Sequence, residues 1–150
     1  MEAIEEILHR AALRGAQAGV GYAGAVLPAE AQRLLAEVPG ARLVDVRTQA
    51  EQDWVGMVPG SIHIEWQRYP GGSPNAQFLP ALLEAVALDS PVLFLCRSGG
   101  RSHAAAAAAA EAGYTRAYNV LEGFEGDKDA QGHRNVLGGW RVAGLPWRQS

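Results

Sequence analysis

An apolar run followed at once by a short polar loop and an alanine tract constrains this chain more than any other feature. Residues 91–95 read Pro-Val-Leu-Phe-Leu, and every position from 104 to 110 is alanine. The first segment is typical of a fully buried strand, and the second is among the strongest helix-forming runs available to a sequence. The chain must therefore pass from strand to helix through a sharp turn.

Helical and extended patterns alternate along the rest of the chain. Helices are expected over 2–18, 29–38, 50–54, from about 77 to 88 and over 101–112, and strands over 41–46, 61–64, 91–96 and 116–120. Near-continuous apolar strands that alternate with helices indicate an α/β fold, with a central, mainly parallel sheet and helices on both faces. In such sheets ligands bind beyond the carboxyl ends of the strands.

The first helix stands apart in the sequence, because a glycine-rich stretch follows it. We therefore predict two units, an N-terminal amphipathic helix with its connection over residues 1–21 and an α/β domain over residues 22–150. The apolar face of the helix could dock on the domain or pair with a second copy of the chain. Its short stripe favours docking.

Composition argues against several classes of protein. The chain is 48% hydrophobic and 19% charged with a net charge of −3, which is ordinary for a globular domain and argues against a nucleic-acid or membrane surface. The acidic N-terminus is not typical of a signal peptide. A single cysteine excludes an internal disulfide and favours the cytoplasm. The four histidines are scattered without metal-ligand spacing, so no metal site is expected.

The polar loop after the apolar run begins with that only cysteine, Cys96. Two adjacent glycines permit positive φ, so backbone N–H groups can converge on one point at the start of the next helix. Such a point attracts an anion, and two arginines add positive charge. These surroundings favour a reactive thiolate over an inert buried cysteine. The loop is expected to hold a thiolate, a persulfide or an oxyanion on Arg97, Ser98, Gly99, Gly100, Arg101 and Ser102.

Three segments in order resemble the signatures of a rhodanese domain. They are Leu-Val-Asp-Val-Arg at 43–47, Val-Pro-Gly-Ser-Ile at 58–62 and Cys-Arg-Ser-Gly-Gly-Arg-Ser at 96–102. Segments at 119–124, 139–140 and 144–146 are similar to the family's C-terminal motifs, so the resemblance covers about residues 22–150. One position departs from the pattern, because Met57 stands where the family commonly has a histidine.

The resemblance implies a single-domain thiosulfate sulfurtransferase. In that family the loop cysteine takes the outer sulfur of a small anionic donor such as thiosulfate, becomes a persulfide and passes the sulfur to cyanide or another thiophilic acceptor. Cys96 matches this catalytic nucleophile, and no cofactor is implied. Backbone N–H groups of the loop would cradle the sulfur, while the guanidinium of Arg97 or Arg101 would attract the donor.

Residues outside the loop also enter the predicted site. Asp45 is expected to brace the active-site edge, and Arg47 to form a structural ion pair for which Glu51 is a candidate partner. Candidates for the pocket wall are Trp66, Arg68, Tyr69, Phe124, His133 and Arg134, although a structural role is commoner for each.

Three other functions stay open at this stage. One is a persulfide carrier that hands sulfur to a protein acceptor, the second is a phosphatase or arsenate reductase, and the third is a non-catalytic interaction module. The module is disfavoured by the intact cysteine loop. The phosphatase is disfavoured because four residues separate Cys96 from Arg101, whereas the related phosphatases have five.

Overall fold

The computed structural model describes residues 2–149, so Met1 and Ser150, the outer ends of the two predicted units, lie outside the described residues. Five parallel strands form one sheet in the order β1-β5-β4-β2-β3. The strands are β1 (Gly24–Val26), β2 (Arg42–Asp45), β3 (Ile62–His63), β4 (Val92–Leu95) and β5 (Ala117–Val120). The helices are α1 (Ile4–Ala18), α2 (Pro28–Glu37), α3 (Gln49–Trp54), α4 (Phe78–Ala85) and α5 (Gly100–Ala112).

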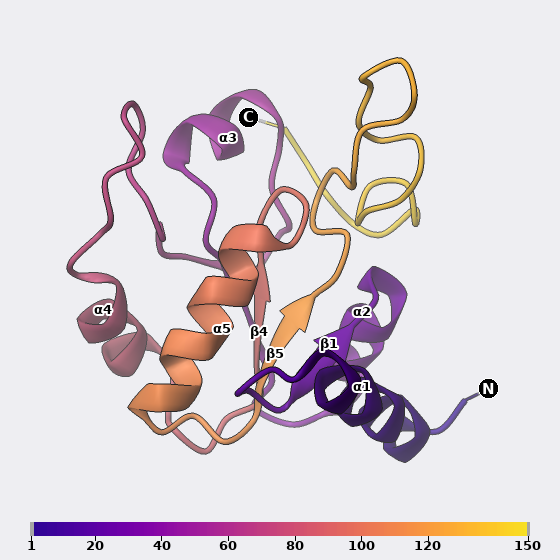
Figure 1. The fold of residues 1–150 in the computed structure, drawn as a ribbon, viewed down its shortest axis with the longest axis vertical. Coiled ribbons are helices and arrows are strands. Elements are labelled where there is room, and N and C mark those ends of the chain that lie inside the picture. The colour runs from indigo at the N-terminus through magenta and orange to yellow at the C-terminus, as the bar shows by residue number, and fades with distance from the viewer. Residues whose placement is uncertain (1, 150) are drawn as a thin grey trace.

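The sheet has a hydrophobic core on each face, which confirms the predicted α/β architecture. Figure 1 shows α4 and α5 on one side of the sheet and α1 and α2 on the other. Strand β4 serves both cores, because Val92 and Phe94 point to the α4/α5 side while Leu93 and Leu95 point to the α1/α2 side. This alternation explains why the strand is apolar at every position.

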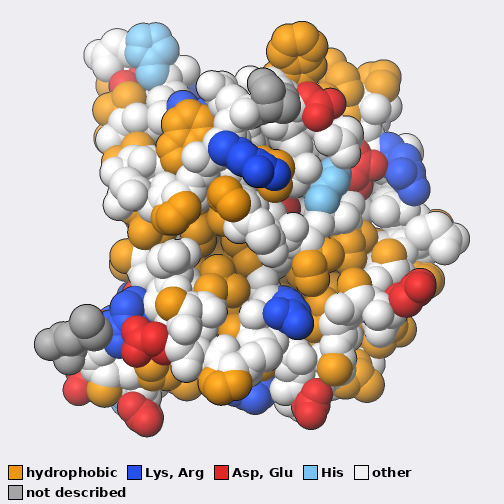
Figure 2. All heavy atoms as spheres, turned by 180° about the vertical axis from the view of Figure 1, so that it is seen from behind, with side chains coloured by type: hydrophobic (Ala, Val, Ile, Leu, Met, Phe, Trp, Pro, Cys, Tyr) orange, Lys and Arg blue, Asp and Glu red, His pale blue; other side chains and the backbone are white. Residues whose placement is uncertain are grey.

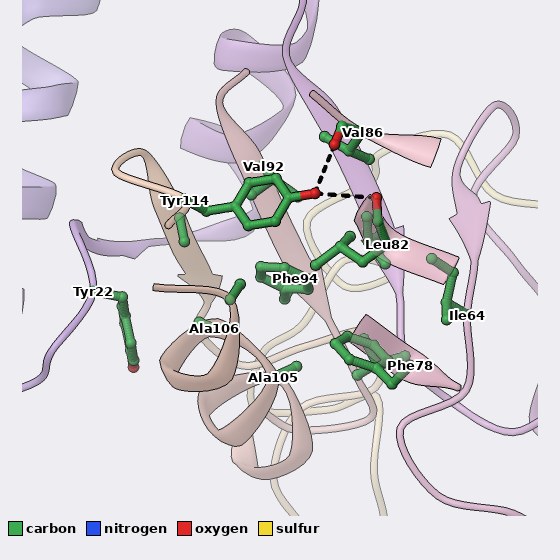
Figure 3. Close-up of a cluster of buried hydrophobic side chains, with 14 of the residues drawn as sticks. Tyr22, Ile64, Phe78, Leu82, Val86, Val92, Phe94, Ala105, Ala106 and Tyr114 are labelled. Atoms are coloured by element: carbon green, nitrogen blue, oxygen red, sulfur yellow. Dashed lines mark hydrogen bonds between the residues drawn. The ribbon is translucent and has the colours of Figure 1, made fainter. Parts of the chain in front are cut away.

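The alanine tract lets α5 lie close against the sheet. Ala105, Ala106 and Ala109 are fully buried in the core that α4 shares, and their small side chains leave room for Phe94. Figure 3 shows Tyr114, just after α5, donating its hydroxyl to the carbonyl oxygens of Leu82 and Val86. The end of α5 is thereby tied to α4 and the segment after it.

Strand β1 is the one element that the sequence patterns did not predict. It has only three residues and follows directly on the glycine-rich stretch, so no alternation can be read from it. Helix α1 packs on this strand and on α2, with Ile7 and Ala11 buried in the same core as Val26. The apolar stripe of α1 is therefore covered by its own chain, while the division into residues 1–21 and 22–150 stays a prediction.

The loops that follow the strands gather at one end of the sheet. In Figure 1 the β4–α5 turn, α3 and the C-terminal tail all lie at the upper end of the molecule. Trp140 anchors the tail, since its ring is fully buried and its Nε1 donates to the carbonyl oxygen of Pro146.

Charged side chains are dispersed over the face of the molecule that is turned away from the viewer in Figure 1. Figure 2 shows Lys and Arg side chains separated by acidic, polar and hydrophobic ones. Among residues 2–149, no helix is both long enough and apolar enough to cross a membrane.

Candidate functional site

Cys96 lies directly beyond the carboxyl end of β4, with 1% of its surface exposed. Gly99 adopts a φ of +114°, which turns the chain back so that its N–H donates to Cys96 Sγ over 3.1 Å. On the helix side, Ser102 Oγ lies 3.3 Å from the same sulfur. The loop therefore closes around the thiol, with the N-terminus of α5 beside it.

Asp45 and Arg47 form a buried ion pair at the end of β2, the strand next to β4. Both side chains are wholly buried, and Arg47 Nη2 lies 2.7 Å from Asp45 Oδ2. The backbone N–H and Nε of Arg47 also donate to Asp45, and Nη2 donates to the carbonyl oxygen of Gly56. Arg47 thus forms a buried ion pair, but its partner is Asp45, and the prediction that Glu51 is the partner is wrong. Asp45 lies only two residues before Arg47, and its carboxylate faces the guanidinium.

Glu51 instead pairs with Arg101 of the cysteine loop. Two hydrogen bonds of 2.6 and 2.8 Å join the carboxylate to the guanidinium, and about a fifth of each side chain is exposed. Although burial raises the pKa of Glu51, the bonds from Arg101 and Thr48 outweigh it and lower this pKa to about 2. The pair fixes the start of α5 to α3, a contact between residues 50 positions apart.

The acid dependence of stability tests this pair. Because the folded-state pKa of Glu51 is about 2 and its ordinary value is 4.5, the stabilisation is complete above pH 4.5 and is lost as the pH falls toward 2. We expect urea unfolding to show a constant free-energy difference between the wild type and Glu51→Gln near neutral pH. That difference should shrink below pH 4.5. A difference that does not vary with pH would contradict the assignment.

A pocket of about 600 Å³ opens beside the loop. The sequence candidates Arg68, Tyr69 and Arg134 line it, together with Arg97 and Arg101. Three other candidates do not line it: Trp66 packs edge-on against Phe78 in the core at 5.0 Å between ring centroids, Phe124 is fully buried, and His133 lies outside the pocket. Sequence reasoning missed the pocket residue Trp54, which is 82% exposed. Its place as the last residue of α3, the short helix that follows β2, is a signal that could have found it.

Asn119 on β5 is a second residue that sequence reasoning did not assign to the site. Its Oδ1 accepts a 2.6 Å hydrogen bond from Ser102 Oγ, and its Nδ2 donates to the carbonyl oxygen of Gly99 over 3.2 Å. Asn119 is the one polar side chain in β5, a strand whose four residues are all buried. A buried polar group in an apolar strand needs a partner, and that requirement is the signal in the sequence.

Metal-binding side chains do not gather in the described chain. Across residues 2–149, no group of three or more His, Cys, Asp or Glu is arranged to hold a metal ion. The groups at the sulfur are the backbone N–H of Gly99 and the hydroxyl of Ser102, and the adjoining pocket holds the guanidinium of Arg97, unpaired within residues 2–149, together with the carboxylates of Glu51 and Glu125, of which Glu51 is paired with Arg101. This donor set suits a small anion at the sulfur.

Residues 27–130 match the rhodanese-like domain family. The uncharacterized protein RP600 of Rickettsia prowazekii is 36% identical over 110 residues, which is 72% of this chain and 83% of RP600. Thiosulfate sulfurtransferase GlpE of Actinobacillus succinogenes is 32% identical over 110 residues, 73% of this chain and 78% of GlpE. The crystal structure of Rv0390 from M. tuberculosis superposes with a TM-score of 0.80 at 47% identity, covering 86% of this chain and 99% of that one.

Proposed function

Because the chain belongs to the rhodanese-like domain family, we propose that it is a sulfurtransferase in which Cys96 carries the transferred sulfur as a persulfide. The observation that carries this proposal is the N–H of Gly99 aimed at Cys96 Sγ over 3.1 Å, at the N-terminus of α5. A donor in that position stabilises negative charge on Sγ once the thiol has lost its proton.

The proposed reaction has two steps, with thiosulfate as donor. The Cys96 thiolate attacks the outer sulfur of thiosulfate, a sulfur–sulfur bond forms to Cys96, and the bond to the central sulfur breaks with its electron pair leaving on sulfite. Cyanide or another thiophilic acceptor then attacks the outer sulfur of the persulfide. The product is thiocyanate when the acceptor is cyanide, and the electron pair of the broken bond restores the thiolate.

Arg97 is the cation that suits the incoming donor. Its side chain is exposed at the pocket, and within residues 2–149 it makes no ion pair. Arg101 is already neutralised by Glu51. The sequence left the choice between these two arginines open, and their different pairing supports Arg97 as the group that attracts a dianionic donor.

The same pairing weighs against phosphate chemistry. An arginine that clamps a phosphate must offer a free, two-pronged guanidinium, whereas both terminal nitrogens of Arg101 are bonded to Glu51. The four-residue spacing between Cys96 and Arg101 points the same way. Activity on an aryl phosphate, with none on thiosulfate, would overturn the proposal.

Intact-protein mass spectrometry tests the persulfide directly. After mixing with thiosulfate we expect a mass gain of one sulfur atom, which disappears on adding cyanide. Cys96→Ser should show no gain, because no other cysteine exists in the chain. An unmodified wild-type protein would refute the proposal. The rate of sulfite release with both thiosulfate and cyanide present then separates catalytic turnover from carriage to a protein acceptor. An enzyme releases sulfite continuously, whereas a carrier is loaded once and stops.

A further inference from the structure

The amide of Asn119 has only one possible orientation in this site. One end of the amide faces the carbonyl oxygen of Gly99, which can accept a hydrogen bond but cannot donate one. The NH₂ group must therefore point to Gly99. The other end, Oδ1, must face Ser102.

The orientation of Asn119 in turn fixes the hydroxyl proton of Ser102. Asn119 Oδ1 is purely an acceptor and lies 2.6 Å from Ser102 Oγ, so the single hydroxyl hydrogen is directed to it. Toward Cys96, 3.3 Å away, Ser102 presents a lone pair. The partner that can satisfy this lone pair is the S–H of Cys96. Cys96, Ser102 and Asn119 are at most 4% exposed, so the arrangement is shielded from bulk water.

We propose that Asn119 is a positioning residue that acts through Ser102 to hold Cys96 as a thiol in the resting protein. A thiolate or persulfide has no proton to donate to Ser102, and two facing acceptors repel each other. The hydroxyl must then leave Asn119 and turn to donate to sulfur, while the thiol proton passes to solvent. The serine is an acceptor before the reaction and a donor during it. This inference deepens the proposed sulfur transfer, on which it rests.

The charged surroundings of the loop stay constant in the variants that test this proposal. They comprise Arg97, Arg101 and His103, Glu51 on α3, the Asp45–Arg47 pair at the end of β2 and Glu122 in the turn after β5. The hydroxyl of Tyr22 also contacts His103 and Asn119. The carbonyl oxygen of Gly99 also keeps a second donor, the N–H of His103, when the Asn119 amide is removed. Because Asn119→Ala also removes the contact with Tyr22, a Ser102→Ala background is needed to show that a change in reactivity acts through Ser102.

The pH profile of Cys96 alkylation by iodoacetamide is the first test. In Asn119→Ala the hydroxyl of Ser102 can donate to the thiolate without giving up a hydrogen bond to Asn119. We therefore expect about a five- to tenfold faster reaction on the acidic side of the profile and a shift of its midpoint to lower pH. In a Ser102→Ala background, Asn119→Ala should cause no further change. Equal effects in both backgrounds would overturn the proposal. Gln49→Ala, which removes an exposed amide bonded to the carboxylate of Asp53 outside this network, should leave the profile unchanged.

The infrared S–H stretching band is the second test, and it needs no variant of Asn119. The chain has one cysteine, so the band has one source and Cys96→Ser provides the blank. If Ser102 accepts from the thiol, the band lies at lower frequency in the wild type than in Ser102→Ala. Identical frequencies would refute the proposal. Neither test uses a sulfur donor, so this inference can fail while persulfide loading succeeds, and loading can fail while both tests succeed.

Discussion

Replacing Asp45 by alanine is expected to lower the free energy of unfolding by about 3 to 5 kcal/mol, because it leaves a buried guanidinium without its counter-charge. Asp45 and Arg47 are both completely buried, and Asp45 accepts four hydrogen bonds from Arg47 and Gln52 within 3.1 Å, besides a longer one from Arg47 Nε. The guanidinium also lies 4.2 Å from the centre of the Phe124 ring, so it cannot turn out to water without opening the core.

Urea unfolding at neutral pH measures this loss, and the chain provides a matched control. Glu37→Ala removes the carboxylate of the Arg33–Glu37 pair on the surface of α2, where the loss should be about 0.5 kcal/mol. Asp45→Ala should also disturb the position of Arg101 in the candidate site. Arg47 holds the carbonyl oxygen of Gly56 just beyond α3, and α3 carries Glu51 to Arg101. Similar losses of unfolding free energy in Asp45→Ala and Glu37→Ala would contradict the large contribution predicted for the buried pair.

For the proposed sulfur transfer, Gly123→Ala is expected to reduce persulfide formation by about a hundredfold, because it displaces the backbone of Cys96. Gly123 has a φ of +64°, and an added Cβ would lie 2.5 Å from the carbonyl oxygen of Cys96. That same oxygen accepts the N–H of Phe124 over 2.8 Å, and the next carbonyl, of Arg97, accepts the N–H of Glu125. The turn after β5 is thus hydrogen-bonded to the backbone of the cysteine loop. A methyl group on residue 123 would push these two segments apart.

The control for this variant separates strain from collision. Gly144 has a similar φ of +75°, but an added Cβ there meets no atom within 4 Å. Gly144→Ala should therefore lose about 1 kcal/mol of stability and retain sulfur loading. Loading rates after thiosulfate addition, followed by intact mass, distinguish the two outcomes. If Gly123→Ala loads as fast as Gly144→Ala, the turn does not position the cysteine.

Most of the architecture could be predicted from the sequence, because its elements carry strong local signals. The buried strand at 92–95 and the helix at 100–112 lie where apolar and alanine runs placed them. Strand β1 could not be predicted, since its three residues are stabilised by β5 and α1 rather than by local preference. Helix α4 is shorter than the expected 77–88, ending at Ala85, where Val86 turns to extended backbone.

The residues of the candidate site show the same difference between local signals and long-range contacts. The order of Cys96, the two glycines and the arginines in one loop determined by itself that the thiol lies in a tight turn with a backbone N–H facing it, because that geometry depends on neighbours in the chain. Partners contributed by distant segments were decided only by the tertiary structure. Glu51 was paired with the wrong arginine, and Asn119 was missed, because their partners lie 50 and 17 positions away. A local pattern specifies a backbone turn, but a buried charge or amide finds its partner only when the core closes around it.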